Sequence, residues 1–400
     1  MALVTGRRPL LAGLGAALAA PLVGRGAAAQ GAPVKIGFIA TLSGPSGYIG
    51  EDQRDAWAIA MAEDGGNALG GVPVQMVTED DALRPASGKT SADRMVGEGV
   101  RLFTGINFSN VLAAVAPSVL EAGGFYVSIN AGPSTFAGKG CHPNYFSASF
   151  QNDSFHEAAG LAANELGYKR VLAMAPNYQA GRDGLAGFKR TFKGELVGEI
   201  YTRLDQTDFS AELSRIRQAK PDALYQFHPG GLGINLTKQY ANAGLSKDIP
   251  MLMAVFAMDE RMLAATGGAA EGQYTTGSWS ATSDNPVSRS FVERFRRAHN
   301  RIPTIYAGQA YDTARLIGSA LRATGGDLRK SDEFRAALRR ADFQSLRGNL
   351  KFDTNQHPIQ DLYLMQVERA PDGEFQHRIV RRVAEAARDA YVAECKMPSA

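Results

Sequence analysis

Apolar segments alternate with amphipathic segments from residue 34 almost to the end of the 400-residue chain. The segments 34–42 (VKIGFIATL) and 168–176 (YKRVLAMAP) have the near-continuous apolar character of buried parallel strands. The segment 51–64 (EDQRDAWAIAMAED) spaces its apolar residues as an amphipathic helix does. Repeated β-α-β units predict parallel sheets covered by helices on both faces. Because the alternation restarts near residue 153, we expect an α/β protein with two doubly wound lobes.

The last third of the chain departs from this pattern. An extended segment (271–281) is followed by helical patterns at 286–300, 304–323 and 333–340. The segments 349–355 (NLKFDTN) and 361–369 (DLYLMQVER) then alternate with period two and predict strands joined by a loop. These pieces predict no third domain, so we expect them to return to the two lobes.

Residues 1–29 have the three-part pattern of a secretory signal. Arg7 and Arg8 precede an apolar segment that ends at Val23, and three alanines (27–29) precede the expected cleavage before Gln30. The arginine pair leaves both the twin-arginine and the Sec route open. Removing this leader takes away three arginines, so 43 basic and 40 acidic residues become equal in number. We therefore expect an exported protein that is not membrane-embedded and binds no nucleic acid.

The chain has two cysteines, Cys141 and Cys395. In an oxidising compartment an even pair favours one disulfide, which would tie the C-terminal tail to the loop that contains Cys141. The alternative is two separate thiols.

Motifs of the common enzyme classes are missing from the sequence. It contains no G-x-S-x-G, no H-E-x-x-H and no phosphate-binding G-x-x-x-x-G-K-[ST], and its six histidines are scattered. Gly44, Gly47 and Gly50 follow a strand, but their spacing differs from the dinucleotide motif G-x-G-x-x-G. We therefore expect no catalytic residue, no metal site and no cofactor, and hence a protein that is not an enzyme.

The predicted strand ends share an unusual composition. Small residues, aromatic rings and neutral hydrogen-bonding groups occur together in LSGPSGYIG (42–50), GINFSN (105–110), INAGPST (129–135), APNYQAG (175–181), QFHPGG (226–231) and AVFAMD (254–259). In open parallel sheets, ligands bind beyond the carboxyl ends of the strands. Six such ends, divided between two lobes, predict a ligand cleft between the lobes.

At this point the sequence resembles the periplasmic binding proteins of the branched-chain amino acid family, which have the type I fold. The resemblance rests on VKIGFIATLSGPSGYIGED, NALGGVPVQMVTEDD, GINFSNVLAAVAPSVLEAGGFYVSINAGPST, PNYQAGRDGLAGFK, DFSAELSRIRQAKPDALYQF and GNLKFD, in that order. It implies two lobes joined by three crossovers, near Phe150, Trp279 and Pro358. Lobe one would comprise 34–149 and 281–357, and lobe two 150–280 and 358–400. It also implies a monomeric periplasmic receptor that delivers a small molecule to the membrane permease subunits of an ABC importer.

The resemblance also implies a ligand site. A ligand carboxylate would be held by Ser109 and by the segment that contains Asn130, Ala131, Gly132 and Ser134. Aromatic and imidazole side chains at strand ends and crossovers would complete the site: Tyr48, Phe108, Phe150, Tyr178, Phe227, His228, Phe256 and Trp279.

Phe256 marks a departure from the family pattern. Members that bind amino acids have a carboxylate there, which pairs with the ligand's ammonium, and an unpaired buried ammonium is costly. The segment INAGPSTFAGKGCHPNYF and the following QNDS are also similar to members that take up aromatic carboxylates. We therefore favour a small aromatic acid as the ligand. The alternatives are branched-chain or other amino acids, amides, and a ligand-sensing regulatory subunit of the same fold.

Overall fold

Parallel strands dominate two sheets in the computed structural model, which describes residues 32–348 and 350–397. The first sheet has the order β2-β3-β1-β4-β5-β6, and only its β2–β3 pair is antiparallel. Its strands are β1 (Val34–Ala40), β2 (Ala68–Leu69), β3 (Val72–Asp80), β4 (Leu102–Thr104), β5 (Phe125–Ser128) and β6 (Tyr145–Ser147). The expected leader at 1–29 lies outside the described residues.

The second sheet has the order β12-β13-β11-β10-β9-β7-β8, and β14 pairs with β13. Its parallel strands are β7 (Arg170–Pro176), β8 (Glu195–Thr202), β9 (Ala223–Gln226), β10 (Met251–Ala254) and β11 (Tyr274–Gly277). The late strands β12 (Lys351–Phe352), β13 (Pro358–Arg369) and β14 (Phe375–Ala387) join by antiparallel pairing. The tail therefore returns to the second sheet, as expected for a segment without a core of its own.

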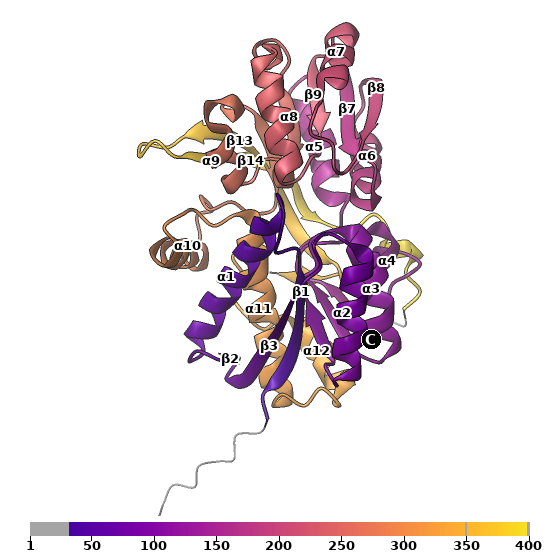
Figure 1. Ribbon diagram of the computed structural model, residues 1–400, viewed down its shortest axis with the longest axis vertical. Coiled ribbons are helices and arrows are strands. Elements are labelled where there is room, and N and C mark those ends of the chain that lie inside the picture. Colours follow the sequence, from indigo (N-terminus) through magenta and orange to yellow (C-terminus); the bar gives the residue numbers. More distant parts are fainter. Residues whose placement is uncertain (1–31, 349, 398–400) are drawn as a thin grey trace, which may run out of the picture. The chain divides into compact units, whose positions relative to one another are not determined.

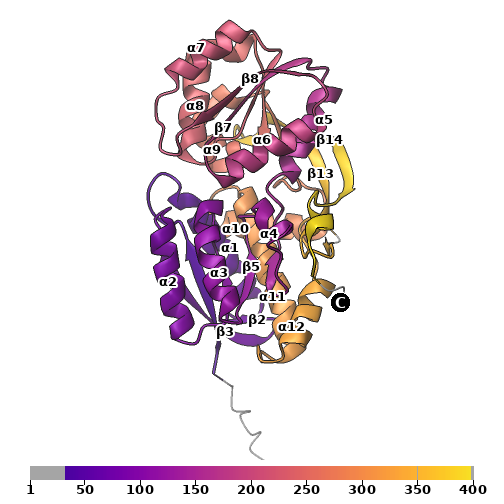
Figure 2. The same cartoon turned by 90° about the vertical axis from the view of Figure 1, so that its right-hand side faces the viewer.

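Helices cover both faces of each sheet. Figure 1 shows α1 (Gly47–Glu63) and α11 (Ile305–Thr324) on one side of the first sheet, and α2 (Pro85–Gly97) and α3 (Ser109–Glu121) on the other. On the second sheet, α5 (Ser154–Glu165) and α6 (Gln179–Thr191) lie opposite α7 (Ser210–Ala219) and α8 (Gly231–Asn242), as Figure 2 shows. The remaining helices are α4 (Ser134–Ala137), α9 (Glu260–Thr266), α10 (Pro286–His299) and α12 (Ser331–Arg340). Below, first lobe means the first sheet with α1–α4 and α10–α12, and second lobe means the second sheet with α5–α9; the predicted boundaries near 149, 280 and 357 stay a proposal.

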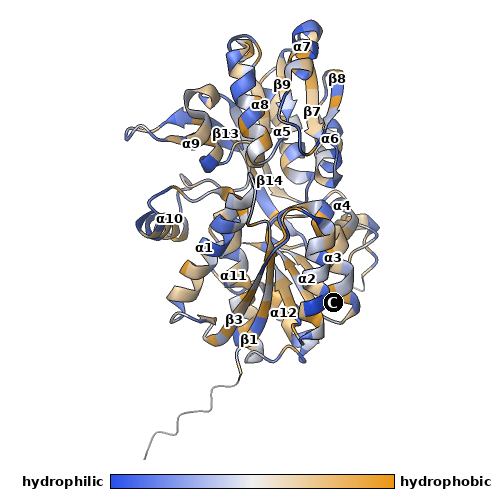
Figure 3. Ribbon diagram, viewed as in Figure 1, coloured by the Kyte–Doolittle hydropathy of each residue, from blue (hydrophilic) through white to orange (hydrophobic). Residues whose placement is uncertain are grey.

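The core follows from the apolar strands. Every residue of β4, β5, β9 and β10 is buried, because helices cover both faces of these parallel strands. Figure 3 shows the apolar residues on the strands and polar residues on outer helices such as α7 and α10. No helix in ranges 32–348 and 350–397 has the length and apolar character needed to cross a membrane.

Three elements differ from the sequence-based expectation. Helix α1 begins at Gly47 rather than at residue 51, so Tyr48 lies in its first turn and not in a loop. Strand β10 ends at Ala254, and a short 3₁₀ turn (Val255–Ala257) carries Phe256. Strand β14 was not predicted, because most of its residues are partly or fully exposed and it shows no continuous apolar run.

Cys141 and Cys395 form the expected disulfide, with Cα atoms 5.7 Å apart. The bridge joins two residues that are 254 positions apart in the sequence and ties the C-terminal segment to the loop after α4. Their distance lies in the normal range for disulfides.

Candidate functional site

A buried cavity lies where the carboxyl ends of strands from both sheets meet. It is lined by Ile49, Asn107, Phe108, Ser109, Asn130, Ala131, Phe150, Asn152, His156, Tyr178, Ala180, Phe227, Pro229, Phe256 and Tyr306. All of these residues are buried, and the cavity volume is about 30 Å³. The segments after β4 and β5 supply one side, and the segments after β7, β9 and β10 supply the other.

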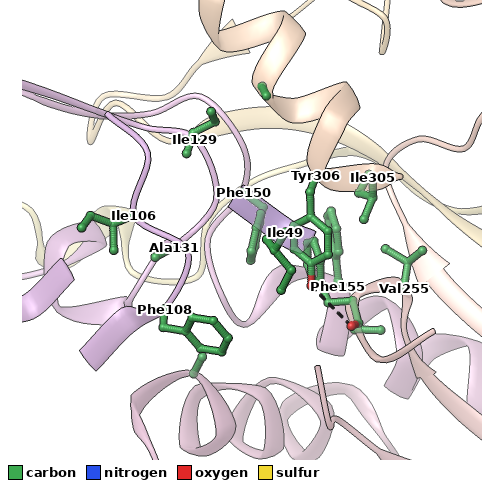
Figure 4. Close-up of a cluster of buried hydrophobic side chains, with 14 of the residues drawn as sticks. Ile49, Ile106, Phe108, Ile129, Ala131, Phe150, Phe155, Val255, Ile305 and Tyr306 are labelled. Carbon is green, nitrogen blue, oxygen red and sulfur yellow. Dashed lines mark hydrogen bonds between the residues drawn. The ribbon is translucent and has the colours of Figure 1, made fainter. Parts of the chain in front are cut away.

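Aromatic rings form much of the cavity surface. The Phe150 ring stacks on Phe256, with centroids 4.6 Å apart, and Tyr306 lies tilted beside Phe256 at 5.5 Å. Figure 4 shows Phe150, Phe155 and Tyr306 together, with a hydrogen bond from the Tyr306 hydroxyl drawn as a dashed line. A second aromatic group is formed by Tyr178, which lies 6.3 Å from Phe108 and 6.4 Å from Phe227 between ring centroids. Flat apolar surface therefore bounds the cavity from both lobes.

Neutral polar groups form the rest of the surface, on the first-lobe side. Asn107 Oδ1 accepts from the Thr41 N–H (2.8 Å) and its Nδ2 donates to Gln53 (2.7 Å), which holds the turn before α3. Ser109 is the first residue of α3, and its hydroxyl oxygen accepts from Asn152 Nδ2 at 3.1 Å. First-turn N–H groups of a helix have no partner within the helix and carry a partial positive charge. This side of the cavity therefore offers hydrogen-bond donors to an anionic group.

No Asp, Glu, Lys or Arg is among the described residues that line the cavity. Burial lowers the pKa of His156 to about 3, so its imidazole is neutral at pH 7, and its Nδ1 is hydrogen-bonded to Tyr225. Burial raises the pKa of Tyr178 and of Tyr306 above the usual value, so both hydroxyls are neutral. The surface that a ligand would contact is therefore uncharged.

The structure brings many of the predicted site residues together at this cavity. Those that line it are Phe108, Ser109, Asn130, Ala131, Phe150, Tyr178, Phe227 and Phe256. It places the other predicted residues elsewhere: Tyr48, Gly132, Ser134, His228 and Trp279 are not among the lining residues.

The predicted carboxylate-binding segment is partly engaged by the protein itself. The Ser134 N–H and hydroxyl donate to the two carboxylate oxygens of Asp183, at 3.1 and 2.8 Å. At Gly132, a Cβ atom would lie 2.1 Å from the Phe150 carbonyl oxygen. The small residue at 132 is therefore required by the close approach of two chain segments, and the donors of Ser134 already have an anionic partner.

The remaining residues placed elsewhere make contacts within the protein. The Tyr48 hydroxyl donates to Asp259 Oδ2 at 2.5 Å and so joins α1 to the residue before α9. His228 is held between Thr202 and Gln226, and Trp279 Nε1 donates to Ser288 Oγ at 2.9 Å. These three side chains stabilise the scaffold around the cavity.

Sequence reasoning did not select several lining residues: Ile49, Asn107, Asn152, His156, Ala180, Pro229 and Tyr306. Asn107 and Pro229 lie within strand-end segments that were singled out, so finer inspection of those segments would have found them. Tyr306 begins α11 and follows no strand of the alternating pattern. Only the tertiary structure brings it to the cavity.

Comparisons with known proteins agree with this architecture. A family model described as "Periplasmic binding protein" matches residues 33–374. The Leu/Ile/Val-binding protein homolog 6 of Brucella melitensis is 30% identical over 363 residues, which cover 87% of this chain and 91% of the relative.

Two solved structures extend the comparison. A solute binding protein of an ABC transporter from R. palustris, in complex with benzoate, has a TM-score of 0.86 and 29% identity, and the match covers 91% of this chain and all (100%) of that chain. One from Rhodopseudomonas palustris BisB5, in complex with 3,4-dihydroxy benzoic acid, has a TM-score of 0.82 and 28% identity, and covers 90% and 99%.

Proposed function

Because the chain belongs to the periplasmic binding protein family and has its type I fold, we propose that it is an exported receptor of an ABC importer. It binds a small aromatic carboxylate between the lobes and delivers it to membrane permease subunits. In this proposal it acts as a periplasmic monomer and catalyses no reaction. Neighbours that were crystallised with benzoate and a dihydroxybenzoate support the choice of ligand class.

The observation that carries the proposal is the absence of a carboxylate among the described lining residues. An α-amino acid would bring a buried ammonium, and leaving it unpaired would cost several kcal/mol. Phe256 contributes an aromatic ring to the surface instead. Aromatic rings pack on one another favourably, so an aromatic ligand fits this lining better than an amino acid does.

The carboxylate has a plausible position at the start of α3. Asn107, Phe108 and Ser109 line the cavity, so the first turn of this 13-residue helix faces it. Helix N-termini bind anions through unpaired N–H groups and the helix dipole, without a cationic side chain. The Ser109 hydroxyl adds a donor at the same place.

Binding must be coupled to movement of the lobes. A cavity of about 30 Å³ holds little more than a water molecule, and its lining residues are buried. An aromatic acid therefore reaches the site only when the two sides separate, and it stabilises the form in which they close around it.

A second candidate is a branched-chain amino acid, which the names of the curated relatives favour. This ligand needs a partner for its ammonium. Asp259 is the nearest acid to Phe256 along the chain, but it does not line the cavity and already accepts hydrogen bonds from Tyr48 and from the first turn of α9. The aromatic acid remains the better-supported ligand.

A thermal unfolding screen with benzoate, hydroxybenzoates, leucine and valine tests the proposal. A ligand at 100 times its Kd adds about 2.7 kcal/mol to the free energy of unfolding. We expect aromatic acids to raise Tm and the amino acids to leave it unchanged. Stabilisation by leucine without stabilisation by any aromatic acid would refute the proposed ligand class.

Replacement of Phe256 tests its role directly. Phe256→Leu keeps an apolar side chain but removes ring stacking, so we expect binding to weaken about 2- to 10-fold. Phe256→Glu places an anion beside the ligand carboxylate and weakens binding further. Tyr201, an aromatic residue with 40% exposure on β8, provides the control Tyr201→Glu, which should bind as the wild type does.

A further inference from the structure

Asn130 carries a hydrogen-bond acceptor that the protein leaves unused. The residue is 7% exposed, follows β5 and lines the cavity. Its Nδ2 donates to the Asn107 carbonyl oxygen at 2.7 Å. No donor in the described part of the chain lies within hydrogen-bonding distance of its Oδ1.

The orientation of this amide is determined by its surroundings. If the Asn130 amide were rotated by half a turn, Oδ1 would face the Asn107 carbonyl oxygen, and two acceptors would oppose each other. The unpaired atom is therefore the oxygen and not the nitrogen. A buried carbonyl oxygen without a donor is unfavourable, and most buried polar groups in proteins are paired.

The other two amides of the lining show that Asn130 is exceptional. Both ends of the Asn107 amide are paired, with Thr41 and Gln53. The Asn152 amide is also paired at both ends, because Oδ1 accepts from Gly132 and Nδ2 donates to Ser109. Among the three lining asparagines, only Asn130 has an amide oxygen that remains available.

We propose that Asn130 is a specificity-determining residue that selects aromatic acids bearing a hydroxyl group over those without one. The hydroxyl of the ligand donates to Asn130 Oδ1 while the carboxylate is held at the start of α3. This inference rests on the proposed function and deepens it.

A neutral donor fits Asn130 better than a charged one. An ammonium would need a negatively charged partner after leaving water, and no described lining residue is acidic. A hydroxyl needs a single neutral acceptor, which Asn130 Oδ1 provides. A ligand without a donor would leave this oxygen buried and unpaired in the closed form.

The test compares ligands that differ by one atom on the ring. Calorimetric Kd values are measured for benzoate, for 2-, 3- and 4-hydroxybenzoate, and for the fluorobenzoates substituted at the same positions. Fluorine is small and cannot donate a hydrogen bond. We expect at least one hydroxybenzoate to bind about tenfold more tightly than its fluoro counterpart, as is typical when a binding site pairs an otherwise unsatisfied polar group.

The variant Asn130→Leu assigns this preference to the residue. Its hydroxyl-to-fluoro affinity ratio should fall to about one, while a thermal unfolding transition confirms that it is folded. If it fails to fold, the wild-type ratio alone decides. The inference is overturned if no hydroxybenzoate exceeds its fluoro counterpart in the wild type, or if the ratio persists in Asn130→Leu. Failure of every aromatic acid to bind would instead overturn the proposed function.

Discussion

At the scale of single residues, the most unusual groups are two buried acids at the start of α9. Burial raises the pKa of Asp259 to about 7 and that of Glu260 to about 8. Asp259 is hydrogen-bonded by Tyr48 and by the first turn of α9, whereas Glu260 Oε2 has no partner among the described residues. Asp52, whose side chain is fully buried and pairs with Arg261, raises both pKa values further. The folded protein therefore holds protons here that the unfolded chain releases.

This proton binding makes stability depend on pH. Because both pKa values are raised on folding, the stabilisation is complete below the ordinary values of 3.8 and 4.5 and is lost as pH rises through about 7 to 8. Glu260→Gln stays neutral at every pH, so we expect its Tm to fall less than that of the wild type between pH 5 and 9. Glu121→Gln on the exposed end of α3 should keep the wild-type slope. Equal slopes for Glu260→Gln and the wild type would contradict this account.

At the scale of elements, a single carboxylate connects α6 of the second lobe to α4 of the first. Asp183 accepts from Ser134, from Asn152 Nδ2 (2.9 Å) and from Gln179 Nε2 (2.7 Å), and it is 5% exposed. Hydrogen bonds to charged groups contribute about 1.5–3 kcal/mol each. This contact should therefore favour the closed form of the cleft.

Asp183→Ala removes the acceptor and leaves the donors of Ser134 and Asn152 without their partner. We expect its Kd for an aromatic acid to rise by at least about tenfold, because each lost charged hydrogen bond opposes closure. Calorimetric titration measures the change. Asp248→Ala, at an exposed position of the same lobe, should bind as the wild type does. An unchanged Kd for Asp183→Ala would show that this contact does not contribute to closure.

At the scale of the whole described chain, access to the cavity depends on the contact between two loops. A groove of about 600 Å³ shares Phe108 and Pro229 with the inner cavity and provides a route from the surface. Beside it, a Cβ atom at Gly231 would lie 2.8 Å from the Pro45 side chain of the opposite lobe. The absence of a side chain at 231 therefore permits the loops to meet in the closed form.

Gly231→Ala should interfere with closure more than with folding. The added methyl group must displace Pro45, so we expect weaker ligand binding, by several-fold, with a Tm close to that of the wild type without ligand. Parallel measurements of Kd and Tm separate the two effects. Gly268→Ala, where nothing lies within 4 Å of the added atom, provides the control. If both variants bind equally well, the contact with Pro45 does not limit closure.

Local patterns were sufficient for much of this protein. The alternation of apolar and amphipathic segments predicted the α/β class, and the ordered motifs predicted the family, which the comparisons confirm. The pair of cysteines predicted the disulfide that the structure contains. Phe108, Asn130 and Phe256 could be selected because the carboxyl ends of parallel strands lie at one edge of a sheet. These features depend on residue type and on neighbours close in sequence.

The tertiary structure alone decided which partner each strand-end side chain meets. Ser134 faces Asp183, Tyr48 faces Asp259, and Tyr306 reaches the cavity from the start of α11. The first two contacts join residues 49 and 211 positions apart, so no local spacing encodes them. The unpaired oxygen of Asn130 likewise exists only because Asn107 orients its amide across the ends of two strands. The sequence determined where a site would form, and the long-range packing of the chain determined which of its groups remain available to a ligand.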